Sequence, residues 1–224
     1  MDTYAAPSAT KRWIELLPEL QAQVESGVAS LTGTDLRGDS LCAGWSRAHV
    51  LTHLARNADA LVAVIGAALD GTGGTMYASS AARDADIEAG ANRSAREIQD
   101  DLAASAQKLA AALARLSAQL DMSEPPVRFV ERTPGGQVMD VLAVPFLRAR
   151  ELTYHHVDLL RGFTFADLPP EFVGTFLADE RLRLEEDPTG SQGRPPVGAA
   201  PADELAYLAR GHATNAEIRD LAKA

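Results

Sequence analysis

The sequence predicts a mainly α-helical protein, built as a four-helix bundle with a small C-terminal segment. Four stretches of the 224-residue chain carry apolar side chains at helical spacing, which is the pattern of amphipathic helices. These stretches are long and their connections are of mixed length, an arrangement that favours a bundle lined by facing helices. Hydrophobic residues make up 46% of the chain, enough to supply one sizeable buried core.

The first two helices of the expected bundle lie in the N-terminal third of the chain. Residues 10–31 place Trp13, Leu17 and Val24 on one stripe, so we expect a helix there. The second helix is expected over residues 46–69, because the hydroxyl of Ser46 can cap free amides of a first turn. A glycine-rich stretch, residues 71–74, ends it.

The third and fourth helices are separated by a stretch that breaks helices. Leucines and isoleucines recur at helical spacing over residues 94–120, which predicts a long amphipathic helix. The Pro and Gly residues of SEPPVRFVERTPGGQV predict an ordered loop or a short hairpin. A fourth helix should end near Leu160, and Pro145 should either start or bend it.

The bundle is expected to occupy residues 1–161, and residues 162–224 to form a small second domain. In this second part LPPEFVGTFLADERLRLEE predicts a helix, DPTGSQGRPPVGAAPADE is irregular, and ELAYLARGH predicts a last short helix. We find no internal repeat.

Charge and cysteine content exclude several classes of protein. A net charge of −10 argues against a nucleic-acid partner, because such proteins present clustered Lys and Arg. No stretch approaches the roughly 18 uninterrupted apolar residues that span a bilayer. The single cysteine, Cys42, cannot form an internal disulfide, and no signal peptide opens the chain. We therefore expect a cytoplasmic protein that does not insert into membranes.

Polar side chains interrupt the apolar face of two of the predicted helices. In ELTYHHVDL, Glu151 and His155 are four positions apart and thus lie roughly 40° apart on one face of a helix. On the second helix His49, His53 and Asn57 follow the same spacing. If the two faces oppose, two histidines and a carboxylate meet, which is what a Zn²⁺ site with an open fourth position requires.

Each of these residues also has a simpler interpretation. Glu151 and His155 could be an exposed helix pair that contributes a few tenths of a kcal/mol, and His53 could be a hydrogen-bonded core histidine. His49 is the main rival of His53 because it lies one turn earlier on the same stripe. We expect His156, about 100° from His155, to be partly solvated. Cys42 has no recognisable general base and is interpreted as a small packed residue.

Three segments carry a resemblance to a known family. LCAGWSRAHVLTHLARNADAL resembles the second helix of the DinB-like superfamily, and TMYASSAARDADIEAG and RARELTYHHVDL resemble mycothiol-dependent maleylpyruvate isomerase, a zinc enzyme of that superfamily. The resemblance covers residues 12–161 well and the rest loosely. It implies a DinB-like four-helix bundle with zinc bound by His53, Glu151 and His155. It also implies a small C-terminal α(+β) domain that covers the active site, although the family's strands have no clear counterpart here.

The same resemblance implies an enzyme that uses mycothiol as its thiol cosubstrate. The reaction converts maleylpyruvate to fumarylpyruvate in gentisate breakdown: a thiolate adds to the cis alkene, the resulting single bond rotates, and the thiolate leaves. Coordination to Zn²⁺ would supply the thiolate. Arg210 resembles the family's C-terminal catalytic arginine, and an Arg fork suits the carboxylates of the substrate. If Arg210 does not serve, the candidates are Arg56, Arg83 and Arg148. Asp158 and Asn57 could orient the zinc ligands.

Two other functions remain open at the level of the sequence. One is a mycothiol-dependent S-transferase that joins the thiol to electrophiles. The other is a catalytically silent metal-binding bundle. The sequence does not decide the oligomeric state, for which a monomer is the simplest expectation, nor which divalent metal is bound.

Overall fold

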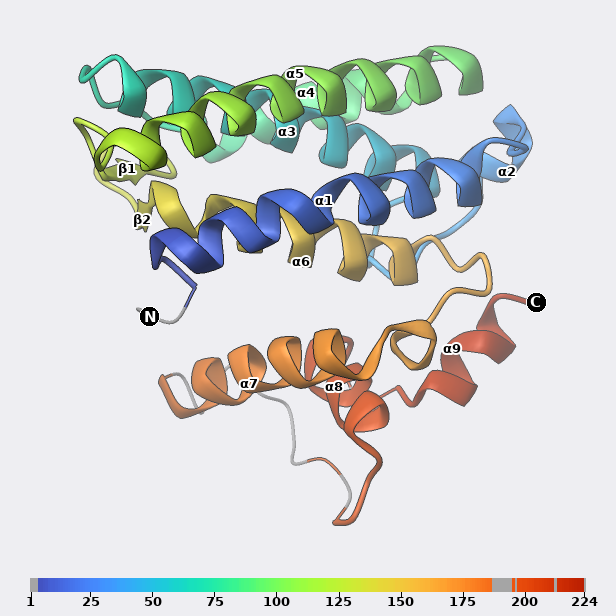
Figure 1. Ribbon diagram of the computed structural model, residues 1–224. Helices are drawn as coiled ribbons and strands as arrows, with labels where there is room; N and C mark the ends of the chain where they lie inside the picture. Colours follow the sequence, from blue (N-terminus) through green and yellow to red (C-terminus); the bar gives the residue numbers. More distant parts are fainter. Residues whose placement is uncertain (1–3, 187–194, 196, 212, 224) are drawn as a thin grey trace. The chain divides into compact units, whose positions relative to one another are not determined.

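The computed structural model describes residues 4–186, 195, 197–211 and 213–223. The chain divides into two compact units (Figure 1). Unit 1 comprises Met1–Asp39 and Gly44–Leu152, and unit 2 comprises Ser40–Ala43 and Thr153–Ala224. The division falls within one continuous helix. The assignment of residues 1–161 and 162–224 to separate functional domains stays a prediction.

Long helices that run along a common direction build unit 1, and these are the helices that the sequence predicts (Figure 1). They are α1 (Pro7–Val28), α3 (Arg47–Leu69), α5 (Ala95–Met122) and α6 (Val144–Asp158). Residues 153–158, at the end of α6, belong to unit 2. A short 3₁₀ turn, η1 (Val141–Ala143), leads into α6. Pro145 is therefore the second residue of the helix, and of the two roles predicted for it, it starts α6. The predicted mainly α-helical fold is confirmed.

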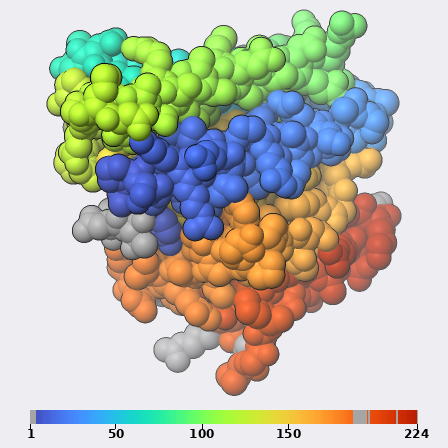
Figure 2. All heavy atoms as spheres, viewed as in Figure 1, coloured from blue at the N-terminus to red at the C-terminus, as the bar shows by residue number. Residues whose placement is uncertain are grey.

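The core of unit 1 lies between the apolar stripes of these helices. Along α3, Leu54, Leu61 and Ile65 are buried, and α5 contributes Leu102 and Leu116. Each buried side chain of this size stabilises the fold by roughly 1.5–3 kcal/mol relative to full exposure. Seen as spheres, α1 and α5 meet along one face of unit 1 (Figure 2). We therefore expect the core of unit 1 to form without a metal.

Aromatic side chains attach the start of α6 to the N-terminal segment. The ring of Phe146 stacks on Tyr4 with centroids 3.8 Å apart, and Trp13 meets it edge-on at 5.3 Å. The hydroxyl of Thr10 also donates to the carbonyl of Leu142 at 2.8 Å. These contacts fix the position of α6 at the point where it enters the bundle.

Two short helices of unit 1 were not predicted, α2 (Gly33–Arg37) and α4 (Ser80–Ala91). In α2 the hydroxyl of Thr32 accepts from the N–H of Asp35, whose carboxylate accepts in return from Thr32 N–H. In α4 only Ile87 is buried, so the segment has no apolar stripe to reveal a helix. Hydrophobic periodicity does not detect a helix that is marked only by its capping residues or by a single buried side chain.

The stretch between α5 and α6 contains the short hairpin that the sequence allowed. Strands β1 (Phe129–Glu131) and β2 (Val138–Asp140) pair antiparallel, with Val130 opposite Met139. The segment before α4 lies along the hairpin, because Met76 and Tyr77 donate backbone N–H groups to the carbonyls of Glu131 and Arg132. The hairpin therefore holds the chain that carries Tyr77.

Unit 2 is helical wherever the structure describes a regular element in residues 162–223. It contains η2 (Phe165–Asp167), α7 (Pro170–Glu186), α8 (Pro201–Ala209) and α9 (Asn215–Leu221). The helices predicted at α7 and α8 are confirmed, and α9 was not predicted. Half of the stretch expected to be irregular, residues 187–204, lies outside the described residues, namely 187–194 and 196. The expectation was wrong for its last four residues, 201–204, which form the start of α8.

One helix, α3, is long and apolar enough to span a membrane by length and composition, with a mean hydropathy of 1.2. Its apolar window is 67% buried inside the molecule, which is typical of a core helix. We therefore assign α3 to the core of unit 1.

Candidate metal centre and its surroundings

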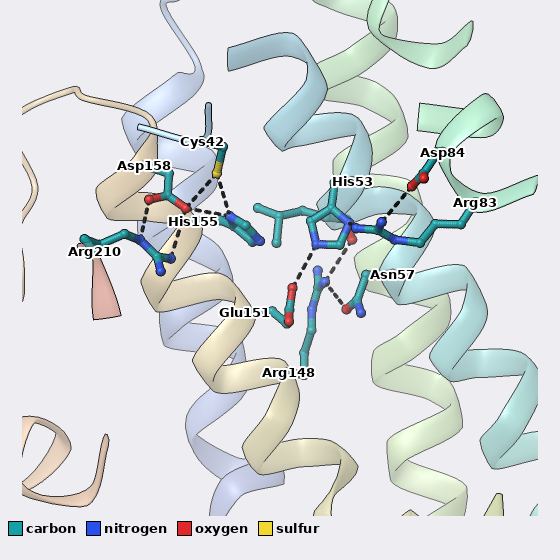
Figure 3. A network of polar contacts seen from close by, with 11 residues as sticks. Cys42, His53, Asn57, Arg83, Asp84, Arg148, Glu151, His155, Asp158 and Arg210 are labelled. Atoms are coloured by element: carbon teal, nitrogen blue, oxygen red, sulfur yellow. Dashed lines mark hydrogen bonds and ion pairs between the residues drawn. The ribbon is translucent and has the colours of Figure 1, made fainter. Parts of the chain in front are cut away.

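His53 and Glu151 face each other inside unit 1. His53 lies on the buried side of α3, with 5% of its surface exposed, and its Nε2 is 2.8 Å from Oε2 of Glu151 on α6 (Figure 3). The indole of Trp45 packs beside the imidazole, with ring centroids 5.5 Å apart. The opposition of polar side chains from the second and fourth predicted helices is thus observed for this pair.

His155 stands one turn beyond Glu151 on the same helix, in the part of α6 that belongs to unit 2. Its Nδ1 is 2.8 Å from Oδ2 of Asp158 (Figure 3). A carboxylate on one ring nitrogen fixes the tautomer and orientation of a histidine whose other nitrogen binds a metal. The orienting role considered for Asp158 is therefore supported by its contact with His155.

Asp158 is fully buried and is the centre of an ionic cluster in unit 2. Arg210 contacts it twice, with Nε 2.5 Å from Oδ1 and Nη2 3.0 Å from Oδ2. The thiol of Cys42 donates to the same carboxylate at 3.2 Å. Burial by itself would raise the pKa of Asp158, but the hydrogen bond with His155 and the charge of Arg210 outweigh it and lower that pKa below its usual range.

The sulfur of Cys42, which was interpreted as a small packed residue, also lies 3.9 Å from Nδ1 of His155. One expectation about the residues near this cluster was wrong. His156 was expected to be partly solvated, but it is buried and stacks on Phe163 at 4.0 Å. Burial lowers the pKa of His156 to about 4, so this imidazole is a neutral core group. Neither result could be read from helical spacing, because Cys42 and Phe163 lie outside α6.

His49, the rival of His53, is engaged at the start of α3. Its Nδ1 accepts from the backbone N–H of Ser46 at 3.2 Å, and its Nε2 lies 3.1 Å from Glu88 on α4. His49 therefore links the N-terminus of α3 to α4. This arrangement favours His53 as the ligand on α3.

Asn57 contacts neither candidate ligand through the oxygen of its side chain. Its Oδ1 accepts from Nη1 of Arg148 at 2.9 Å, and the same nitrogen donates to the carbonyl of Leu54 at 2.8 Å. Nη2 of Arg148 donates to Gln21 at 3.3 Å. Burial lowers the pKa of Arg148 to about 10, and Glu151 opposes that shift. Arg148 thus places a buried positive charge near Glu151 instead of facing a ligand.

Two residues near His53 were not chosen as site residues from the sequence, Tyr77 and Arg83. Arg83, on α4, lies with Nη2 3.4 Å from Nδ1 of His53 and with its guanidinium 5.8 Å from the Trp45 ring centre and 6.0 Å from that of Tyr77. Burial raises the pKa of Tyr77, against the lowering effect of Arg83. From the sequence, Arg83 was only an alternative to Arg210 as the substrate-binding arginine. The residues of α4 show no hydrophobic periodicity that would predict a helix and so place Arg83.

The donor sets near α6 differ in their fitness for a cation. Cys42, His155 and Asp158 offer ligand atoms within 4.8 Å of one another, but Arg210 already neutralises the carboxylate of this set. Within unit 1, His53 and Glu151 bring an imidazole and a carboxylate together. Imidazole nitrogens and carboxylate oxygens are ligands that Zn²⁺ accepts.

The chain matches a known protein family. The family described as "Mycothiol maleylpyruvate isomerase N-terminal domain" matches residues 17–160. The chain belongs to this family of isomerases. The match contains α3 and α6, and thus His53, Glu151 and His155. No curated protein matches the chain.

Two crystal structures are similar in fold to this chain. A crystal structure of mycothiol-dependent maleylpyruvate isomerase has 23% sequence identity and a TM-score of 0.77, covering 92% of this chain and 91% of that chain. A crystal structure of a histidine-to-alanine mutant of mycothiol-dependent maleylpyruvate isomerase has 21% identity and a TM-score of 0.75, covering 89% of this chain and 88% of that chain. The similarity in fold therefore extends over both units of this chain.

Proposed function

We propose that this protein is a zinc- and mycothiol-dependent isomerase that converts maleylpyruvate to fumarylpyruvate in gentisate degradation. The observation that carries the proposal is the pairing of His53 with Glu151 in the interior of a bundle of this family. An imidazole and a carboxylate converge there from different helices, and His155 follows one turn later on α6.

His53, Glu151 and His155 are proposed to hold one Zn²⁺. A carboxylate and two neutral imidazoles leave a net positive metal, which favours an anionic fourth ligand. When bound, zinc would supply deprotonation of the mycothiol thiol, whose unperturbed pKa is roughly 8.5. His155 is suited to the role because Asp158 engages its Nδ1.

The thiolate of mycothiol then acts as a nucleophile that is returned unchanged. It adds to one alkene carbon of maleylpyruvate, the former double bond becomes single, and the electron pair moves onto the conjugated carbonyl oxygen. Rotation about the single bond and expulsion of the thiolate restore the alkene in the trans form. No protein nucleophile is consumed, so Cys42 is not needed for this chemistry.

Arg210 is proposed to act in catalysis by stabilising negative charge that develops on the substrate. In unit 2 its guanidinium is held by Asp158 and lies over the ring of Tyr154 at 4.9 Å. The ion pair fixes its direction and keeps a cation beside the group that orients His155. Preorganised charge of this kind acts on a transition state without a cost for reorganisation.

The remaining parts of the proposal concern location and partners. A net charge of −10 and a buried α3 support a cytoplasmic protein that binds neither nucleic acid nor membrane. Its partners would be mycothiol and a small dicarboxylate, with a monomer as the simplest assembly.

The direct test is an assay of zinc-loaded protein with maleylpyruvate, with and without mycothiol. We expect fumarylpyruvate to form only when the thiol is present. Accumulation of thiol conjugates with electrophiles, and no fumarylpyruvate, would identify an S-transferase instead. Bound zinc without turnover of any thiol and electrophile pair would identify a silent metal-binding bundle.

A further inference from the structure

The proposed substrate carries two carboxylates, and the arginines near the bundle interior differ in their ability to bind one. Arg148 is buried and donates to carbonyl and amide oxygens. Arg56 has its Nη2 between the carboxylates of Asp101 at 2.7 Å and Asp59 at 3.0 Å, which neutralise its charge. Arg210 is held by Asp158. Arg83 has one exposed acidic partner, Asp84 at 2.8 Å.

Arg83 also has donor capacity that unit 1 does not use. Its Nε is buried and has no hydrogen-bond partner among the described residues. The side chain is 19% exposed, and its guanidinium lies 5.8 Å from the ring centre of Trp45 and 6.0 Å from that of Tyr77. A guanidinium oriented by aromatic rings, with a buried N–H left unsatisfied, is suited to receive an acceptor.

The contact between Arg83 and His53 constrains the tautomer of the imidazole. A guanidinium only donates hydrogen bonds, so Nδ1 of His53 accepts from Arg83 in the tautomer whose ring proton lies on Nε2, toward Glu151. A neutral histidine that binds zinc through Nε2 must carry its proton on Nδ1. Nδ1 is then a donor that faces a donor, and the guanidinium loses this acceptor.

On the basis of the proposed function, we propose that Arg83 binds a carboxylate of the dicarboxylate substrate. The bound carboxylate accepts from the guanidinium and replaces the acceptor that His53 withdraws when its Nε2 is coordinated. Arg83 thus determines specificity for a dicarboxylate over a monocarboxylate. The residue acts by binding and takes no part in proton transfer.

The test measures affinity and needs no turnover. Zinc-loaded protein is titrated calorimetrically, without thiol, with maleate and with isocrotonate, a cis monocarboxylate of similar shape. The two probes share a cis alkene and one carboxylate, so their affinity ratio reports the contribution of the second carboxylate. We expect maleate to bind about ten- to a hundredfold more tightly, as one charge-assisted hydrogen-bonded pair contributes.

In Arg83→Gln the ratio should fall to about one with zinc content unchanged, and Arg83→Lys should restore part of it because the charge remains but the fork does not. Arg96→Gln is the matched control, since Arg96 is 91% exposed and pairs only with Asp100 among the ion pairs described. The inference is overturned if Arg83→Gln keeps the parent ratio, or if the parent protein shows no preference for maleate.

Kinetics separate this inference from the proposed function. Arg83→Gln should raise the KM for maleylpyruvate about ten- to a hundredfold and leave the KM for mycothiol unchanged. If the parent protein selects maleate through Arg83 but produces no fumarylpyruvate, the proposed function fails and the inference stands. If the KM for mycothiol rises instead, Arg83 serves the thiol and the inference fails.

Discussion

At the scale of single residues, the role of each side chain in the candidate centre depends on which other residues it contacts. His53 and His49 lie one turn apart on α3, yet His49 joins Ser46 to Glu88, whereas His53 faces Glu151. Two histidines on one stripe of the same helix therefore contact different partners.

The first residue-scale prediction compares these two histidines. His53→Ala should lose most bound zinc, because one of three ligands is removed, while His49→Ala should retain it. Loss of the His49 contact at the start of α3 should cost about 0.5–2 kcal/mol of stability. Zinc per chain and urea unfolding check both. Full zinc occupancy in His53→Ala, with loss in His49→Ala, would exchange their roles.

A second prediction concerns the thiol. Cys42→Ser should keep zinc and turnover, because the nucleophile is the thiol of mycothiol and a serine hydroxyl can still donate to Asp158. Steady-state rates with mycothiol at saturation provide the measurement. A large loss of kcat in a folded Cys42→Ser protein would mean that the protein thiol takes part.

A third prediction concerns Arg210. Arg210→Ala should reduce kcat/KM by roughly ten- to a thousandfold while zinc content stays unchanged, because a charge that acts on the transition state is removed. Arg210→Lys should recover only part of the loss. If zinc is lost together with the rate, Arg210 acts by holding Asp158 and, through it, His155.

At the scale of elements, α4 is attached to the bundle by few side chains and carries Arg83. Ile87 is its one buried residue, and Gly90 lets the helix approach α3 closely. A Cβ added at Gly90 would lie 2.4 Å from Cγ2 of Thr52, a buried side chain. The position of α4 therefore depends on the absence of a side chain.

Two glycine substitutions test this packing with the same chemical change. Gly90→Ala should cost about 1–3 kcal/mol by overpacking and increase amide exchange in α4. Gly66→Ala, where no atom lies within 4 Å of the added Cβ, should stabilise α3 by about 0.5–1 kcal/mol. Urea unfolding and amide exchange read out both. Equal effects of the two substitutions would contradict the close contact.

At the scale of the whole molecule, the apolar core and the candidate metal centre contribute separately to the protein. The buried stripes of α3 and α5 supply the core, so the fold should not require the metal, unlike small domains that fold only around zinc. Function is expected to require it.

Removal of metal tests this separation. Chelation should abolish isomerisation and leave the far-UV circular dichroism spectrum of a helical protein. The melting temperature should fall only by the amount that mass action assigns to a ligand of the folded state. Added zinc should restore activity. Unfolding on chelation would show that the metal holds the bundle together.

Much of the fold and part of the candidate site were predictable from the sequence. Periodicity identified α1, α3, α5 and α6 because each buries a continuous stripe, and the capping hydroxyl of Ser46 predicted the start of α3, which begins at Arg47. The spacing of Glu151 and His155 follows from α6 alone. Local regularity produces these signals, so one sequence sufficed to read them.

Only the tertiary structure decided which side chains meet across elements. It brought Glu151 to His53 from 98 positions away and Arg210 to Asp158 from 52 positions away, and it placed Arg83 of α4 beside His53. Such contacts depend on how the helices and loops pack against one another. The hydrophobic periodicity of a single segment contains no information about that packing. The sequence by itself determined the four long helices and the residues proposed to bind zinc, because burial and ligand chemistry act through residue type and spacing. The partners of those residues were decided by packing, which joins groups that are distant along the chain.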